Sequence, residues 1–144
     1  MRRHPVDALT GVPTRGAAHD ALSSLRAGDA VVMLDVDGLK VTNDTLGHLA
    51  GDDVLRAVAD HLRAGVRAQD VVARWGGDEF VVVLRGAGDV AIEIVERLRA
   101  SSPAAFSAGV AIYSGDRDDV LASADAALLA AKRAGGALVV EAES

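Results

Sequence analysis

Two short apolar runs separated by a glycine pair constrain the fold of this chain more than any other feature of its sequence. Residues 71–84 read VVARWGGDEFVVVL, and valine dominates both flanking runs. Short runs of β-branched residues are typical of strands, and Gly76 and Gly77 between them provide the free backbone dihedrals of a tight turn. We therefore expect a β-hairpin that places the adjacent carboxylates of Asp78 and Glu79 at one end of a sheet.

Hydrophobic periodicity and cap residues predict the other elements. We expect, in order, a helix capped by Thr14 and ended by Gly28, a strand buried on both faces at residues 30–36, a short helix at 39–46, a helix opened by Asp52 and ended near Gly65, the hairpin, a helix capped by Asp89, a strand at 105–113, a helix from about Asp118 to Ala134, and a closing strand at 137–140. Hairpin and crossover connections are mixed in this order, which is typical of α+β domains. We predict a single domain over residues 1–144, with a mostly antiparallel sheet and helices packed on it.

Charge and composition exclude several classes of protein. Of the 144 residues, 50% are hydrophobic and 25% are charged, and the net charge is -6. This charge argues against nucleic-acid binding through a general basic surface, although a few placed cations can still bind a small phosphorylated ligand. The chain has no cysteine, which excludes disulfides and thiolate metal sites. No long apolar span is present, so we expect a soluble, cytoplasmic protein without a membrane segment.

Acidic residues end the first predicted strand as well as the hairpin. Asp35 and Asp37 are two positions apart, which puts both side chains on one face of a sheet. If the strand end and the hairpin tip lie together, three or four carboxylates converge there. All-oxygen, carboxylate-rich sites suit Mg²⁺, which completes its shell with water and substrate phosphate oxygens. The alternative is that these acids only cap strands and solvate turns.

Polar residues after the acidic pair suggest a nucleotide. Gly38 precedes Lys40, so a short helix beginning there would present free N–H groups and a positive charge to a phosphate. Lys40 alone is equally consistent with a surface lysine. Asn43 and Asp52 together can read a guanine edge, the carboxylate accepting from N1–H and N2–H₂. Separately, Asn43 is explained as a helix-end amide and Asp52 as an N-cap.

Five segments in order carry a resemblance to a known family. They are DALTGVPTR, LDVDGLKVTNDTLGHLAGDDVL, RAQDVVARWGGDEFVVVL, FSAGVAI and ADAALLAAKRAGG. Over nearly its whole length the chain thereby resembles the GGDEF family of diguanylate cyclases. The resemblance implies a palm-like nucleotide-cyclase fold with a central, mostly antiparallel five-stranded sheet surrounded by helices. It also implies that two GTP molecules condense to cyclic di-GMP and pyrophosphate, with Mg²⁺ or Mn²⁺ as cofactor.

The same resemblance implies roles for individual residues. Asp35, Asp78 and the carbonyl of Val36 match the metal ligands. Asp78, Glu79 and Lys40 match catalytic positions, Glu79 being the second signature acid. The positions that match the substrate-binding residues of the family are Gly38, Leu39, Lys40, Asn43, Asp52, Gly76, Gly77 and Lys132.

A second site is implied by the sequence RAQD at residues 67–70. Arg67 and Asp70 match the inhibitory site at which many family members bind their product, and Arg74 is an auxiliary candidate there. Arginine is suited to the guanine Hoogsteen edge. The alternative is a surface ion pair between residues three apart on a helix end.

The chain departs from the family pattern near its end and in its domain content. Gly136 stands where the family has a phosphate-binding arginine in a Gly-Arg-Asn sequence. The reaction also needs two GTP-loaded sites facing each other, so the resemblance implies a homodimer, and we identify no sensory or dimerisation domain in the 144 residues. The alternative function is a degenerate domain that binds cyclic di-GMP or GTP as a signal without turnover.

Overall fold

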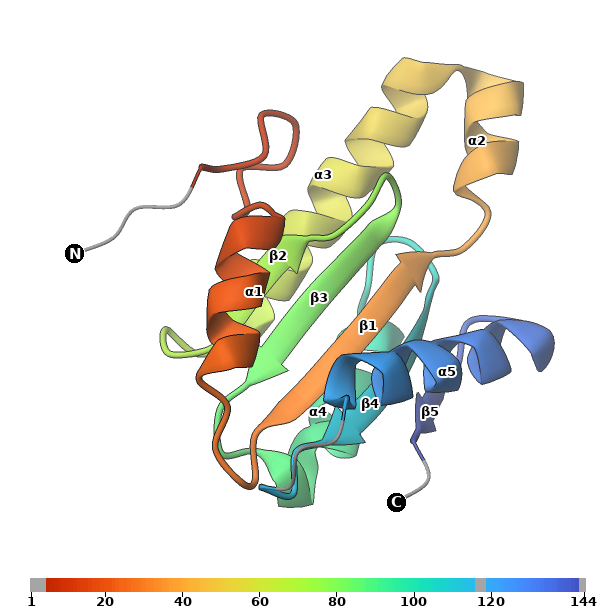
Figure 1. Cartoon of the computed structure of the whole chain (residues 1–144). Coiled ribbons are helices and arrows are strands. Elements are labelled where there is room, and N and C mark those ends of the chain that lie inside the picture. Colours follow the sequence, from red (N-terminus) through yellow and green to blue (C-terminus); the bar gives the residue numbers. More distant parts are fainter. Residues whose placement is uncertain (1–4, 116–118, 143–144) are drawn as a thin grey trace.

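A five-stranded mixed sheet forms the centre of the molecule (Figure 1). The computed structural model describes residues 5–115 and 119–142. The strands are β1 (Ala30–Val36), β2 (Val71–Arg74), β3 (Glu79–Leu84), β4 (Phe106–Ile112) and β5 (Val139–Glu141), in the spatial order β2-β3-β1-β4-β5. Only the β4–β5 pair is parallel among these neighbours, so the expected α+β fold with a mostly antiparallel sheet is confirmed.

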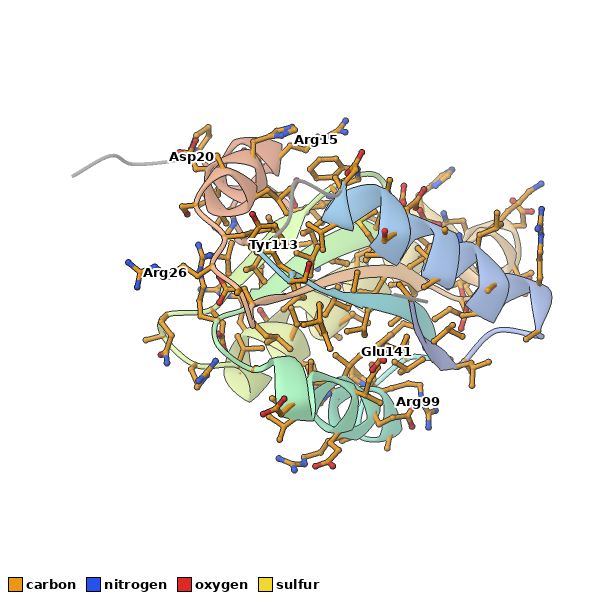
Figure 2. All side chains as sticks on the ribbon, turned by 60° about the horizontal axis from the view of Figure 1, so that its bottom comes forward. Arg15, Asp20, Arg26, Arg99, Tyr113 and Glu141 are labelled. Atoms are coloured by element: carbon orange, nitrogen blue, oxygen red, sulfur yellow. The ribbon has the colours of Figure 1, made fainter. Side chains whose placement is uncertain are left out.

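Helices cover both faces of this sheet. They are α1 (Arg15–Ser23), α2 (Leu39–Leu46), α3 (His48–Gly65), α4 (Ala91–Ala100) and α5 (Val120–Arg133), with a 3₁₀ turn, η1, at Gly88–Val90. Helices α3 and α4 pack on one face and α1 and α5 on the other, so Arg15 of α1 and Arg99 of α4 lie on opposite sides of the sheet (Figure 2). Helix α2 extends past the end of the sheet together with the start of α3 (Figure 1).

The central strand β1 is buried on both faces, as its continuous apolar run predicts. Val32 and Leu34 belong to the core beneath α3 and α4, whereas Val31 and Met33 belong to the core beneath α1 and α5. Because side chains alternate along a strand, one apolar run supplies both cores. Asp35 therefore ends a strand with little access to water.

Close approach of α5 to the sheet depends on Gly109 in β4. A Cβ at this position would overlap the carbonyl oxygen of Ala124 and the amide nitrogen of Leu128, both of which are backbone atoms of α5. Backbone cannot move aside as a flexible side chain can, so glycine is required here. This contact fixes the height of α5 above the sheet and brings Lys132, in its last turn, to the end of β1.

The predicted helix starts are partly wrong. Thr14 occupies the N-cap position of α1, but its side chain makes no cap hydrogen bond, and its hydroxyl donates to the Pro5 carbonyl. Helix α3 begins at His48, so Asp52 lies inside it and is not its cap. Asp89 lies in η1, and Val90 precedes α4. Asp118 is outside the described residues.

Helix α3 starts before its predicted position because Gly47 connects it directly to α2. Its φ of 90° lies in the left-handed region, and the residue ends α2 and opens α3 at once. No loop separates the two helices, so no capping side chain is needed where the sequence pattern placed one.

Asp29 provides a test of stability against pH. Its carboxylate accepts hydrogen bonds from the backbone N–H groups of Arg26 and Gly86, both at 2.8 Å, and from Arg85 Nη1 at 3.0 Å. Burial opposes the charged form of Asp29, but these hydrogen bonds outweigh burial and hold its pKa below the usual value. Protonation therefore favours the unfolded chain, and the stability contributed by Asp29 is lost as pH falls through its folded-state pKa.

We expect Asp29→Asn to be less stable than the wild type by about 1–3 kcal/mol near neutral pH. This difference should shrink as the medium is acidified below about pH 4, where Asp29 of the unfolded chain begins to bind a proton, and should continue to shrink as pH falls through the lower folded-state pKa. Urea unfolding of the wild type and of Asp29→Asn at a series of pH values measures the free energy of unfolding of each protein. The other acidic residues titrate in both proteins, so only the difference between the two free energies reports on Asp29. A gap that stays constant down to pH 2 would contradict the proposed linkage.

Candidate active site

Strand pairing brings the first acidic pair to the hairpin. Asp35 and Glu79 are direct partners in the antiparallel register of β1 with β3, and the N–H of Val36 donates to the carbonyl oxygen of Asp78 at 3.0 Å. The predicted meeting of the strand end and the hairpin is therefore confirmed.

Asp35 is the least satisfied polar residue at this meeting point. It is 6% exposed, one carboxylate oxygen binds Lys132 Nζ, and the other, Oδ1, is buried without a hydrogen-bond partner in the described part of the chain. Burial, together with the neighbouring carboxylate of Asp78, raises the pKa of Asp35 to about 7, against the opposing effect of Lys132. A cation between Asp35 and Asp78 would relieve both the buried orphan oxygen and the repulsion.

The carboxylates that converge are fewer than the sequence suggested. Asp37 lines the same cavity as Asp35, as the period of two predicts, but its carboxylate accepts from Ser107 Oγ at 2.8 Å and from the N–H of Ala137 at 2.8 Å. Within residues 5–115 and 119–142, no three or more His, Asp or Glu side chains form a metal-binding group. A divalent ion would therefore take two carboxylates, and water or phosphate would fill most of its shell. This donor set fits Mg²⁺, which keeps several waters and favours substrate phosphates.

The two turn glycines serve a purpose different from the predicted one. Neither Gly76 nor Gly77 has a φ in the left-handed region, so the turn does not depend on the conformations that only glycine adopts readily. A Cβ on Gly76 would lie 3.0 Å from Oε1 of Glu79, whereas one on Gly77 would meet nothing within 4 Å. Gly76 makes room for the acid, and Gly77 leaves open space beside it.

Arg74 holds the shape of this turn. Its guanidinium donates to the carbonyls of Gly76 at 3.2 Å and Gly77 at 2.7 Å, and it forms an ion pair with Asp7 at 3.0 Å. Burial opposes ionisation of Asp7, but hydrogen bonds from Thr10 and Arg74 outweigh it and lower the pKa. Asp7 is not among the functional residues predicted from the sequence, although it lies in the DALTGVPTR segment.

Trp75 adds a second support from α1. The guanidinium of Arg15 lies 4.0 Å from the centre of the Trp75 ring, and the ring of His19 is 5.1 Å away between centroids. Trp75 is half-buried, and cation–π contacts of this kind stabilise such rings. The N-terminal segment and α1 thus contact the hairpin directly.

A cavity of about 420 Å³ opens beside Asp35. Its lining residues are Asp35, Val36, Asp37, Gly38, Ala105, Lys132, Gly135, Gly136 and Ala137. Gly38 is the N-cap of α2 and no side chain caps this end, so free backbone N–H groups start at the cavity. Leu39 packs against the core, and Lys40 is exposed on α2.

Lys132 is the cation in the lining of this cavity. Burial opposes its charged form, but the hydrogen bond and charge of Asp35, followed by the charges of Asp78 and Glu79, raise its pKa. It stays protonated at neutral pH and has 41% of its side chain exposed toward solvent. The arrangement presents helix N–H groups and one fixed positive charge to an anion.

Gly136 and Ala137 form a tight left-handed turn at the cavity mouth. Gly136 has a φ of 79°, and a Cβ there would lie 3.3 Å from the carboxylate of Asp37. Ala137 has a φ of 50°, which is costly for alanine. The turn therefore faces Asp37 where the family pattern has an arginine.

We expect Ala137→Asn to stabilise the chain by about 0.5–1 kcal/mol, because asparagine tolerates the left-handed region better than alanine. Ala134→Asn is the matched control, because Ala134 has a φ of -83° at the end of α5. Chemical denaturation of both variants measures the effect. Equal stability of Ala137→Asn and the wild type would show that no strain is stored at this turn.

Asn43 and Asp52, the predicted base-reading pair, lie on two helices that fold back on each other. Asn43 is in α2 and Asp52 in α3, and the side chain of Asn43 reaches the backbone of Gly51, next to Asp52. The structure therefore brings the two positions together beyond the end of the sheet.

Arg67 and Asp70 form an ion pair with each other, at the end of β2 that is opposite the hairpin tip. Arg67 donates to Asp70 through Nε at 3.1 Å and Nη2 at 3.0 Å, and Asp70 also accepts from the N–H of Arg85 at 2.9 Å. The hydrogen bond to Asp70 raises the pKa of Arg67. Both residues line a cavity of about 680 Å³ between α1 and the end of α3. Arg63 and Arg85 also line this cavity, whereas Arg74 does not.

The chain is similar to known proteins in both sequence and fold. The family model "Diguanylate cyclase, GGDEF domain" matches residues 4–137. The chain is 39% identical to diguanylate cyclase DgcP of Pseudomonas aeruginosa, over 90% of this chain and 22% of DgcP. It is 36% identical to diguanylate cyclase TpbB of the same species, over 88% of this chain and 35% of TpbB. The chain thus spans only about a fifth to a third of the length of these relatives.

Solved structures agree with this match. The GGDEF domain of DgcB from Caulobacter crescentus, in complex with c-di-GMP, is 30% identical and superposes with a TM-score of 0.87, covering 100% of this chain and 99% of that one. The GGDEF domain of TpbB from Pseudomonas aeruginosa is 33% identical with a TM-score of 0.88, covering 96% and 95%. In the described ranges, no helix combines the length and the apolar character needed to cross a membrane.

Proposed function

Because this chain belongs to the GGDEF family of diguanylate cyclases, we propose that it condenses two GTP molecules into cyclic di-GMP and pyrophosphate. The observation that carries the proposal is the buried, unpaired oxygen of Asp35 beside the carboxylate of Asp78, at a cavity that also holds Lys132. A structural role alone does not account for an orphan carboxylate oxygen next to a second acid.

The proposed metal site consists of Asp35, Asp78 and the carbonyl of Val36. When bound, Mg²⁺ or Mn²⁺ would supply the positive charge that phosphoryl transfer requires around the α-phosphate. Glu79 lies on the same face as Asp35 and, with Lys40, completes the proposed catalytic group. Phosphoryl transfer depends mainly on positioning and charge neutralisation, and the rigid sheet end provides the positioning.

The proposed substrate lies between the cavity and the α2–α3 pair. Its β- and γ-phosphates contact Lys132 and the backbone of Gly38 and Leu39, and its guanine contacts Asn43 and Asp52. The open side of Gly77 leaves room for the nucleotide. The reaction joins two such sites in a homodimer, in which each 3′-oxygen bonds to the α-phosphorus of the other GTP, pyrophosphate leaves, and the 3′-hydroxyl proton is released. GTP as substrate is consistent with a cytoplasmic location.

Incubation of the purified chain with GTP and Mg²⁺ over a range of protein concentrations tests this function. We expect cyclic di-GMP, separated chromatographically, to form at a rate that rises faster than linearly with protein, because two monomers must meet. Absence of product at every concentration, with the fold intact by circular dichroism, would instead identify a degenerate domain without turnover.

Product inhibition at Arg67 and Asp70 is also proposed. Its support is the cavity that Arg67 and Asp70 line, together with the Arg67 side chain, which Asp70 holds in place and which is 49% exposed. Arg74 is the proposed auxiliary residue of this site, and in the structure its guanidinium donates to the carbonyls of Gly76 and Gly77 at the hairpin.

We expect Arg67→Ala to weaken binding of cyclic di-GMP by at least tenfold in calorimetric titration, with initial cyclase rates unchanged. Arg56→Ala is the matched control, because Arg56 is also 49% exposed and forms an ion pair with the acid three residues away, Asp53. Equal affinity of Arg67→Ala and the wild type would rule out product binding through this pair.

A further inference from the structure

Gly51, inside α3, lies where a side chain would collide with Asn43. Gly51 is buried, and a Cβ on it would overlap Oδ1 of Asn43 and lie 2.8 Å from its Cγ. Glycine is among the least favourable residues for a helix interior, so its presence here is not explained by helix formation. The space that it leaves is filled by the amide of a residue on the neighbouring helix.

The two polar side chains next to this space are not engaged elsewhere. Within residues 5–115 and 119–142, no hydrogen bond or ion pair involves the side chain of Asn43 or that of Asp52, the residue after Gly51. Both residues are half-buried. The amide of Asn43 lies against Gly51, and Asp52 is the next residue, so the two side chains can supply a hydrogen-bond donor and acceptors from neighbouring positions.

The turn at Gly47 makes this arrangement possible. Its φ of 90° folds α2 back on α3 without a loop, and its N–H donates to the backbone carbonyl of Asn43 at 2.9 Å. The backbone of Asn43 is therefore fixed, and the orientation of its amide depends on what α3 presents to it. Only a residue without a Cβ at position 51 permits the observed orientation.

We propose that Gly51 is a positioning residue for base recognition, which keeps the amide of Asn43 beside Asp52 so that the two side chains read the guanine edge together. This inference rests on the proposed function. The colliding atoms are the far end of the Asn43 side chain rather than backbone, so an alanine at position 51 displaces the amide and leaves the helices in place. Donation to guanine O6 is then lost, while the Asp52 carboxylate still accepts from N1–H and N2–H₂.

Titration with a GTP analogue that carries an α,β-methylene bridge tests the proposal, because this analogue cannot be cleaved at the reacting bond. We expect Gly51→Ala and Asn43→Ala each to weaken binding about tenfold, and the double variant to bind no more weakly than Asn43→Ala alone. Such non-additivity is expected when one residue acts through the other. In cyclase assays, KM for GTP should rise about tenfold in Gly51→Ala, with kcat within twofold of wild type.

The remaining outcomes would contradict either the role of Gly51 or the proposed function. Equal affinity of Gly51→Ala and the wild type, or losses that add in the double variant, would overturn the role of Gly51. If Gly51→Ala alone does not fold, the proposal requires that Asn43→Ala restore folding by removing the collision, and failure to do so overturns it. Absence of binding by the wild type would overturn the proposed function itself, which is a distinguishable result.

Discussion

Replacing Asp78 by alanine is expected to lower kcat by roughly 10³-fold while the chain stays folded. Asp78 contributes one of the two carboxylates at the proposed metal site, and no third acid takes its place in the described residues. Its side chain is not part of the core, and its proximity raises the pKa of the buried Asp35. Loss of Asp78 therefore removes a repulsion as well as a ligand.

The stability of Asp78→Ala separates these two effects. In the presence of EDTA we expect its thermal midpoint to equal or exceed that of the wild type, because the two carboxylates no longer repel each other. Added Mg²⁺ should raise the midpoint of the wild type and not that of the variant, because only the wild type has the complete site. Asp44→Ala, which removes an exposed acid on α2, is the control. Turnover within tenfold of wild type in Asp78→Ala would remove Asp78 from the metal site.

Replacing Lys132 by methionine is expected to weaken GTP binding by about 10- to 100-fold, the loss of one charge-assisted phosphate contact of roughly 1.5–3 kcal/mol. The effect should be large in this chain because Gly136 supplies no second cation, and Lys132 is the cationic residue that lines the cavity. Calorimetry with the α,β-methylene GTP analogue measures the affinity. Arg133→Met is the control, because Arg133 is about 100° around α5 from Lys132.

Lys132→Met should also make the stability of the chain depend more strongly on metal. Without Lys132, the buried carboxylate of Asp35 has no cationic partner, and we expect a loss of about 1–3 kcal/mol in metal-free buffer. Mg²⁺ should recover most of this loss by binding the same carboxylate. Affinity for the analogue within twofold of wild type, together with an unchanged response to Mg²⁺, would contradict both roles of Lys132.

The strands and the C-terminal ends of α3 and α5 were predictable because they depend on local patterns, whereas α1 ends at Ser23 and not at the predicted Gly28. The doubly buried run of β1 and the hairpin require only neighbouring residues to specify them, and both agree with the structure. The start of α3 was not predictable from cap residues, because the conformation of Gly47 replaces a cap. Similarly, Gly76 is needed for space beside Glu79, a relation that dihedral preferences do not reveal.

The sequence by itself determined the family, the hairpin and the set of acids from which a metal site can be built, because motif order and periodicity are properties of the linear chain. Only the tertiary structure decided which acids are available. Asp37 accepts a hydrogen bond from Ser107, 70 residues away, and Arg74 donates to Asp7, 67 residues away. One oxygen of Asp35, in contrast, has no partner in the described part of the chain. The physical reason is that hydrogen bonding and burial depend on which distant residues the fold brings together. Within residues 5–115 and 119–142, these contacts leave one buried carboxylate oxygen, Oδ1 of Asp35, without a partner beside a cavity.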